Sequence, residues 1–262
     1  MRACVFALLM LALPACFKSV TGGFHVAKLA FELPPRAEWD APVGQVAGSF
    51  RYLGRGSQCY AFVQGDVVLK FLRFDKARVP FWKRCLGWGG EKLKVPPFER
   101  VERSLNSCAL AFWEAREETG LLAVHLNPTE GEWGEVTLEL PLGRSVRVSL
   151  DKYRFLVQRR AVQVETLFQQ IGRAEKRERI RQLFGLIAQR AKKGIVNRDL
   201  NVLRNFGFAG NQPVEFDFGC YIRSGAIPWQ DEVTRFGLQF EERIGDPELA
   251  LWVHEAMEEA LQ

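Results

Sequence analysis

The pattern of apolar and polar positions changes about half-way along the chain, from short strand-like runs to longer runs with a helical period. Three apolar runs, at 49–53, 60–63 and 66–71, are separated by turns that contain glycine, and this spacing predicts a three-stranded antiparallel meander. Four further strands are predicted after the meander, over residues 121–126, 135–140, 145–150 and 152–158.

Two segments carry the period of an amphipathic helix. A helix is predicted over 97–119 because its apolar residues recur at alternating intervals of four and three positions: Val101, Leu105, Cys108, Phe112 and Ala115. A longer helix is predicted over 175–193, where apolar side chains share one face and Gly194 provides the stop. The acidic run after residue 230 is interpreted as the solvated side of a terminal helix.

The order of these elements predicts an α+β fold with two lobes. Residues 49–160 are expected to form a β-rich lobe, and residues 161–262 a short helical lobe. The segment 17–48 contains three prolines, so it is expected to be an extended approach to the domain that lies outside its core.

Residues 1–16 have the layout of a secretory signal: one basic residue, an apolar stretch over 3–15 and a small residue before Cys16. The stretch is too short to span a bilayer comfortably, and its end resembles a bacterial lipoprotein box in which Pro14 replaces the usual small residue. With such a leader the protein is expected to be exported or membrane-associated in a bacterium. The alternative, a buried apolar segment or a start codon assigned too early, leaves it cytoplasmic.

Composition and charge exclude some classes of protein but do not indicate a function. With 47% hydrophobic and 26% charged residues the chain is an ordinary globular protein, and a net charge of +5 is too small for a nucleic-acid coat protein, so no specific nucleic-acid binding is expected. Eight basic and two acidic residues lie between 70 and 94, interspersed with Phe and Trp. Residues 71–94 are therefore a candidate surface for an anionic membrane, with a solvated insertion as the alternative. Six scattered cysteines without a C-x-x-C pair, and three histidines far from one another, give little support for a zinc site.

Two motifs in the β-rich half point to nucleotide chemistry. In the turn Leu53–Cys59, Gly54 and Gly56 let the backbone approach a polyphosphate, although a tight hairpin uses glycine equally well. Lys70 is the one charge in an apolar strand, and it suits nucleotide phosphates if a carboxylate on a neighbouring helix holds it; an edge lysine that faces water is the alternative. The candidate carboxylates are Glu99, Glu102 and Glu114, of which Glu102 is favoured.

Two further motifs follow the long helix. In Ile195–Asn205, Asp199 lies six positions before Asn205, so a carboxylate can deprotonate a hydroxyl while an amide oxygen holds a metal ion. In Val214–Gly219 an apolar strand ends in Asp217, a candidate Mg²⁺ ligand. Each piece taken singly also suits a turn or a helix cap, and their order along the chain is more specific than any one of them.

These four pieces, in this order, resemble the protein-kinase-like superfamily, which includes eukaryotic-type protein kinases and bacterial small-molecule and lipopolysaccharide-core kinases. The resemblance covers residues 49–222 and implies a two-lobed kinase-like fold. It further implies that the protein uses ATP and Mg²⁺ to transfer the γ-phosphoryl group to a hydroxyl acceptor on a protein, lipid or glycolipid. The implied roles are nucleotide binding by Gly54, Gly56, Lys70 and Glu102, catalysis by Asp199, and metal binding by Asn205 and Asp217.

The sequence departs from the family pattern at three positions. Cys59 replaces the third glycine of the loop, Asn197 replaces a histidine, and Asn205 lies one position later than usual after the aspartate. The late asparagine implies either an inserted residue or a different metal ligand, Asn201. The chain after Gly219 is short, with no convincing terminator of a substrate loop. These departures leave a second interpretation open: a catalytically impaired pseudokinase that acts as a binding or scaffold module, membrane-anchored if the leader is real.

Overall fold

The computed structural model describes residues 21–74 and 97–262, which form two compact units. The first unit consists of the described residues up to Val101 together with His125–Val157, and the second of Glu102–Val124 and Gln158–Gln262. Strands dominate the first unit and helices the second, so the predicted α+β class is confirmed. Among the described helices, none is long and apolar enough to cross a membrane.

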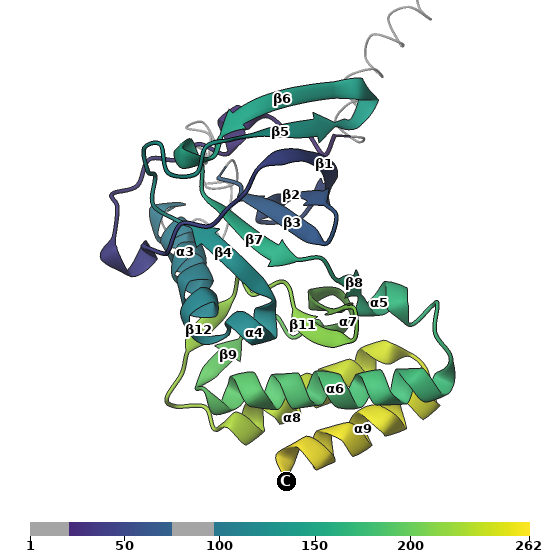
Figure 1. Cartoon of the computed structure of the whole chain (residues 1–262). Helices are drawn as coiled ribbons and strands as arrows, with labels where there is room; N and C mark the ends of the chain where they lie inside the picture. The colour runs from purple at the N-terminus through teal and green to yellow at the C-terminus, as the bar shows by residue number, and fades with distance from the viewer. Residues whose placement is uncertain (1–20, 75–96) are drawn as a thin grey trace, which may run out of the picture. The chain divides into compact units, whose positions relative to one another are not determined.

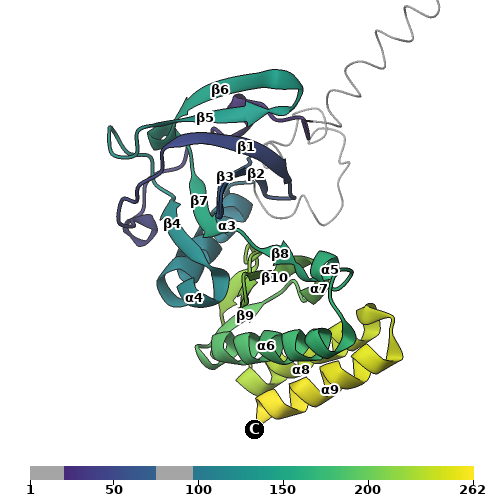
Figure 2. The same ribbon diagram turned by 45° about the vertical axis from the view of Figure 1, so that its right-hand side comes forward.

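The first unit is built on a mixed sheet in which six strands follow the order β7-β3-β2-β1-β5-β6. β1 pairs with β2 and β2 with β3 in antiparallel register, which confirms the predicted meander, whereas β1 and β5 run parallel. Figure 2 shows β5 and β6 extending the sheet beyond β1. The strands are β1 (Gly48–Arg55), β2 (Cys59–Gln64), β3 (Val67–Leu72), β5 (Glu135–Leu140), β6 (Arg144–Ser149) and β7 (Phe155–Arg159), with short 3-10 turns η4 (Pro141–Gly143) and η5 (Leu150–Lys152).

The described part of the N-terminal segment belongs to the core of this unit, so the expectation that it lies outside is wrong. It forms two 3-10 turns, η1 (Val26–Lys28) and η2 (Ala37–Trp39), and Leu29 and Trp39 are each only 1% exposed. The buried guanidinium of Arg154 donates to the backbone carbonyl of Phe31 at 2.7 Å. Isolated apolar residues in an irregular chain have no period, so the sequence pattern did not reveal their burial.

The second unit combines seven α-helical segments and short strands, most of them near their predicted places. The helix predicted over 97–119 is interrupted at Ala115, and the helix predicted over 175–193 is confirmed with nearly the same bounds. The elements are α3 (Pro97–Glu114), α4 (Arg116–Thr119), β4 (Leu121–His125), β8 (Val162–Gln163), α5 (Val164–Leu167), α6 (Arg173–Lys192), β9 (Ile195–Asn197), α7 (Val202–Asn205), β10 (Phe206–Ala209), β11 (Gln212–Glu215), β12 (Tyr221–Arg223), α8 (Trp229–Ile244) and α9 (Pro247–Leu261).

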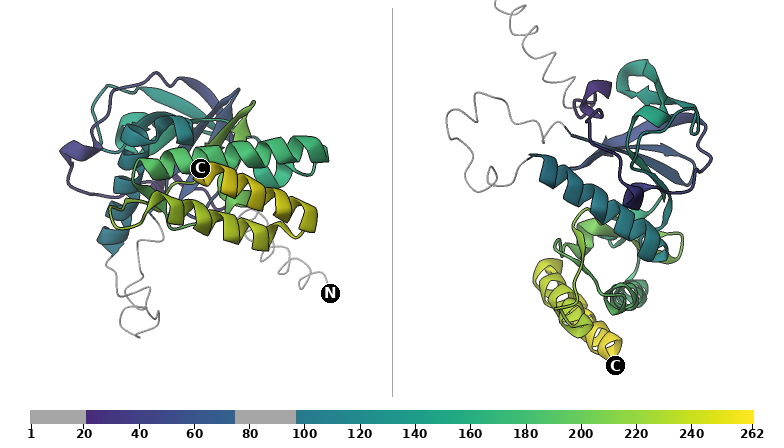
Figure 3. Two further views of the ribbon diagram at one scale, coloured as in Figure 1. Left: turned by 90° about the horizontal axis from the view of Figure 1, so that it is seen from below. Right: turned by 90° about the vertical axis from the view of Figure 1, so that its left-hand side faces the viewer.

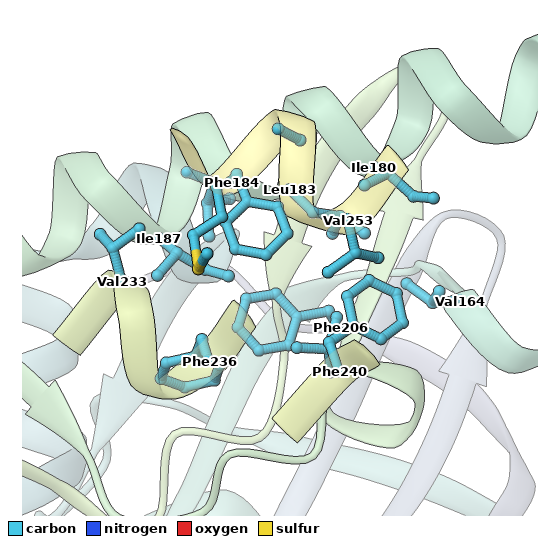
Figure 4. Close-up of a cluster of buried hydrophobic side chains, with 14 of the residues drawn as sticks. Val164, Ile180, Leu183, Phe184, Ile187, Phe206, Val233, Phe236, Phe240 and Val253 are labelled. Atoms are coloured by element: carbon cyan, nitrogen blue, oxygen red, sulfur yellow. The ribbon is translucent and has the colours of Figure 1, made fainter. Parts of the chain in front are cut away.

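The core of the second unit lies between α6 and the two C-terminal helices, which run alongside it (Figures 1 and 3). Figure 4 shows Phe184 and Ile187 of α6 beside Phe236 of α8, with Phe206 of β10 among them, and all four are fully buried. α6 ends at Lys192, and Gly194 follows its C-cap with a φ of +74°, in the left-handed region that glycine adopts without strain. The core therefore fixes α6 and the segment after it, where the candidate catalytic residues lie.

Two glycines of this unit make a matched pair for a test of the packing. A Cβ at Gly207, on β10, would lie 2.5 Å from the carbonyl oxygen of Val162, whereas a Cβ at the exposed Gly185, inside α6, would meet nothing within 4 Å. We expect Gly207→Ala to lower the free energy of unfolding by about 1–3 kcal/mol because backbone must move. Gly185→Ala should raise it by about 1 kcal/mol, since alanine is the better helix former. Urea unfolding of both variants measures the difference, and equal effects would contradict the packing described.

Candidate functional site

A two-stranded ladder brings the two acidic motifs together in the second unit. β9 and β12 are antiparallel, with Asn197 opposite Tyr221. In an antiparallel pair the end of one strand lies beside the start of the other. The segment that follows β9, with Asp199, and the segment that precedes β12, with Asp217, therefore leave the ladder at the same end.

Asn205 joins the two acidic segments by hydrogen bonds. Its side-chain Nδ2 donates to the carbonyl oxygen of Asp199 at 3.3 Å. Its own carbonyl oxygen accepts from the amide of Phe216 at 2.9 Å and from the amide of Asp217 at 3.3 Å. Since Nδ2 is used in this way, the side-chain oxygen of Asn205 is the atom left for a cation.

The carboxylates of Asp199 and Asp217 are exposed, in contrast to the buried residues around them. Each accepts one long hydrogen bond from a backbone amide two positions on: Asp199 Oδ1 from Asn201 at 3.3 Å, and Asp217 Oδ1 from Gly219 at 3.5 Å. Two carboxylates and one amide oxygen fit Mg²⁺, which takes oxygen ligands and completes its shell with water and phosphate. Within the described residues there is no cluster of three or more His, Cys, Asp or Glu side chains suited to a metal.

The geometry bears on the choice between Asn201 and Asn205. Asn201 is the N-cap of the four-residue helix α7, and its carbonyl accepts from the amide of Asn205 at 2.8 Å. This helical turn accommodates the longer spacing after Asp199 and ends with Asn205 against the backbone of Asp217. Asn205, which contacts both acidic segments, therefore suits the role better.

A buried ion-pair network lies behind the exposed carboxylates. Arg190 of α6, Glu215 of β11 and Glu232 of α8 are each 0% exposed. Arg190 Nε lies 2.9 Å from Glu215 Oε2, although its N–H does not point along a hydrogen bond, and Arg190 Nη1 donates to Glu232 Oε1 at 2.9 Å. The guanidinium also donates to the carbonyl of Ile195 at 2.8 Å and lies over the ring of Tyr221. A buried cation requires such neighbours because burial without them is costly.

The Glu215 carboxyl is held by two hydrogen-bond donors and one cation. Tyr221 Oη donates to Oε2 at 2.6 Å and Asn197 Nδ2 donates to Oε1 at 2.6 Å, beside the Arg190 charge. Burial raises the pKa of Glu215, and Arg190 opposes this rise. Burial, with the adjacent Glu215 charge, raises the pKa of Tyr221 well above its ordinary value, so the phenol keeps its proton and remains a donor.

A hydroxyl of α3 holds the backbone just after Asp217. Ser107 is 2% exposed; its Oγ donates to the carbonyl of Phe218 and accepts from the amide of Tyr221 at 2.8 Å. The Phe218 ring is itself buried and lies 5.9 Å from the ring of Tyr221. Helix α3 therefore fixes the segment 218–221 through one side chain.

In the first unit, the glycine turn and Lys70 share a face of the meander. Gly54 of β1 and Lys70 of β3 are both opposite Ala61 of β2, so the three positions form a row across the strands. Directly opposite residues point to the same face. A Cβ at Gly54 would meet nothing within 4 Å, so the space beside this glycine is open. The row therefore consists of two small residues, Gly54 and Ala61, followed by Lys70. Arg73 Nη1 donates to the carbonyl of Gly56 at 3.2 Å and so holds the backbone of the turn.

One of the three carboxylates considered for Lys70 has another partner. Glu114 forms an ion pair with Arg223 of β12 within the second unit. Glu99 and Glu102 lie on α3, and the role of Glu102 as the partner of Lys70 stays a prediction. The leader 1–16 and most of the basic stretch 71–94 lie outside the described residues, so these two expectations also stay predictions.

Sequence reasoning missed four residues that support this site: Ser107, Arg190, Glu215 and Glu232. Glu215 had a signal, since it is a charge between Val214 and Phe216 in an otherwise apolar run. Arg190 had a fainter one, three positions after the buried Ile187 in α6. Both signals are also typical of charges that face water, so only the fold separates the two cases.

No protein-family model and no curated protein sequence matches the chain. Among solved structures it is similar to the bifunctional kinase-methyltransferase WbdD. The co-crystal structure of WbdD with the kinase inhibitor LY294002 gives a TM-score of 0.43 at 14% identity, over 79% of this chain and 44% of that one. A second WbdD structure gives a TM-score of 0.39 at 14% identity, over 78% and 42%. This chain thus spans less than half of the WbdD chains, and likeness at these TM-scores decides no question of function.

Proposed function

We propose that this protein is an ATP- and Mg²⁺-dependent phosphotransferase of the protein-kinase-like type, which transfers the γ-phosphoryl group to a hydroxyl of a protein, lipid or glycolipid. The observation that carries the proposal is the contact of Asn205 with both Asp199 and Asp217. Two motifs separated along the sequence are thereby neighbours, with both carboxylates exposed. This is the donor set that phosphoryl transfer requires from a kinase-like protein.

The second unit supplies the residues that act at the transferred group. Asp199 orients the acceptor hydroxyl and takes its proton as the new P–O bond forms and the bond between the γ-phosphorus and the bridging oxygen of ADP breaks. Asp217 and Asn205 would hold Mg²⁺, which neutralises phosphate charge when bound. The backbone that carries them is buried or hydrogen-bonded, so the carboxylates need little rearrangement.

The first unit supplies the residues that hold the nucleotide. Gly54 and Gly56 contribute no side chain at two positions of the segment that leads from β1 to β2, and Lys70 offers a cation on the same face as Gly54. We assign Glu102 to the support of this lysine. Cys59 in place of a third glycine leaves a more crowded turn, since a Cβ at Gly56 would lie 3.6 Å from its Sγ.

The alternative is a pseudokinase that binds partners without phosphoryl transfer. The departure at Asn197 does not favour it, because the Asn197 side chain donates to the carbonyl of Asp217 at 3.4 Å and so keeps the two loops in contact. The two functions differ in one measurable property: the phosphotransferase transfers the γ-phosphoryl group of ATP, and the pseudokinase does not.

Substitution of Asp199 and substitution of Asp217 are expected to have different effects on ATP binding and on phosphoryl transfer. Asp199→Asn keeps the acceptor for the Asn201 amide, so Mg²⁺-dependent ATP binding should persist while phosphoryl transfer falls by about 10²–10⁴-fold. Asp217→Asn should lose the Mg²⁺-dependent part of binding and transfer together. Calorimetric titration of ATP with and without Mg²⁺ measures the first property, and radiolabelled transfer to the chain itself or to water measures the second.

The exposed Asp231 of α8 provides the control, since Asp231→Asn makes the same chemical change away from the site. Equal loss of binding and transfer in both site variants, with Asp231→Asn unaffected, would contradict the separate roles. Wild-type protein that binds no ATP at millimolar concentration would contradict the proposed function and favour the scaffold.

The row formed by Gly54, Ala61 and Lys70 gives an independent test in the first unit. Lys70→Met removes the cation and should weaken ATP binding by roughly tenfold, which is about 1.4 kcal/mol. Ala61→Leu fills the row and should weaken binding while Lys70 is intact. Lys152→Met, on η5, is the control for loss of a positive charge. Unchanged ATP affinity in the two row variants would exclude this face as the nucleotide site.

A further inference from the structure

Asn197 contacts both acidic segments although its side chain is completely buried. Its Oδ1 accepts from the amide of Asp199 at 3.0 Å, and its Nδ2 donates to the carbonyl of Asp217 at 3.4 Å. The backbone amide of Asn197 donates to Glu232 Oε1 at 2.8 Å. This one amide side chain therefore hydrogen-bonds to both candidate active-site segments.

The orientation of the Asn197 amide is fixed by Glu215. Nδ2 donates to Glu215 Oε1 at 2.6 Å, and the opposite orientation would place the amide oxygen against a carboxylate and a carbonyl. Glu215 is held in turn by Tyr221 and by the Arg190 charge. It lies two positions before Asp217, so the carboxyl that orients Asn197 belongs to the segment that carries the candidate metal ligand.

We propose that Asn197 and Glu215 are positioning residues for the magnesium site, and that their hydrogen bond sets the register between the Asp199 and Asp217 segments. This inference rests on the proposed function. Both side chains are 0% exposed, so neither touches a ligand, and both act through the backbone of the exposed aspartates. When the hydrogen bond is lost, the β9–β12 ladder and Asn205 still join the segments, but one of the contacts that set their relative position near Asp217 is missing.

A positioning role differs from general stabilisation in what it does to metal dependence. Misplaced ligands weaken metal binding, and loss of residues that orient ligands typically reduces metal affinity by about 10–100-fold. Contacts of the nucleotide that do not involve the metal should be unaffected. The measured quantity is therefore the ratio of the Kd without Mg²⁺ to the Kd with Mg²⁺, by calorimetry on the full chain with the β,γ-imido analogue of ATP.

The primary variants are Asn197→Ser and Glu215→Met, which removes the acceptor for Asn197 Nδ2, with Arg235→Gln as the matched control. Arg235 donates to Glu232 Oε2 at 2.9 Å, so its loss disturbs the same network from the solvent side without contact with either acidic segment. We expect the ratio to fall by about 10–100-fold in the primary variants and to stay within about twofold of wild type in the control, with metal-free affinity unchanged.

Tyr221→Phe covers the case in which a primary variant does not fold. It removes one donor to Glu215 and keeps the ring in place, so a smaller fall in the ratio is expected. Folded variants with a wild-type ratio would overturn the positioning role. If the affinity of the wild-type chain for the analogue does not depend on Mg²⁺, both the proposed function and this inference are overturned. Failure of the positioning role alone therefore differs from failure of the proposed function in the behaviour of the wild-type chain.

Discussion

The candidate site depends on the burial of one guanidinium. Arg190 has no exposed surface, and its charge is compensated by Glu215 and Glu232, which are equally buried. Removal of one partner from such a network typically costs about 3–5 kcal/mol because a charge is left without compensation inside the protein. The three residues come from α6, β11 and α8, so the network ties the helical core to the segments that carry the candidate catalytic groups.

Charge in the second unit is divided between a buried set and an exposed set. Glu215 and Glu232 are buried and accept hydrogen bonds from Asn197, Tyr221 and Arg190, so their role is structural. The carboxylates of Asp199 and Asp217 belong to exposed residues and each accept a hydrogen bond from a backbone amide two positions on, so they can meet a ligand. The side chain of Asn197 bonds to a member of the buried set and to the backbone of both exposed aspartates.

Much of the fold followed from periodicity. The meander, the helix α6 and the strands β4–β7 were predictable because alternation and helical period report burial within one element. Burial that depends on distant contacts was not predictable: Trp39 lies in an irregular segment, and Arg190 lies in a helix that also carries the exposed Arg173, Arg177 and Arg181. The candidate acids were found from the order of the motifs, whereas Glu215 and Ser107 required the fold, since a charged or hydroxyl side chain has the same appearance in sequence whether its partners are water or protein.

The central claim is that Asp217 and Asn205 hold a metal ion beside a nucleotide. The most direct measurement is a crystal structure of the full chain with Mn²⁺ and the β,γ-imido analogue of ATP, with the anomalous scattering of manganese used to locate the ion. The account predicts Mn²⁺ coordinated by the Asp217 carboxylate, the Asn205 side-chain oxygen and phosphate oxygens, with the Asp199 carboxylate facing the γ-phosphoryl group. Manganese and nucleotide bound elsewhere, with Asp217 and Asn205 unliganded, would contradict it.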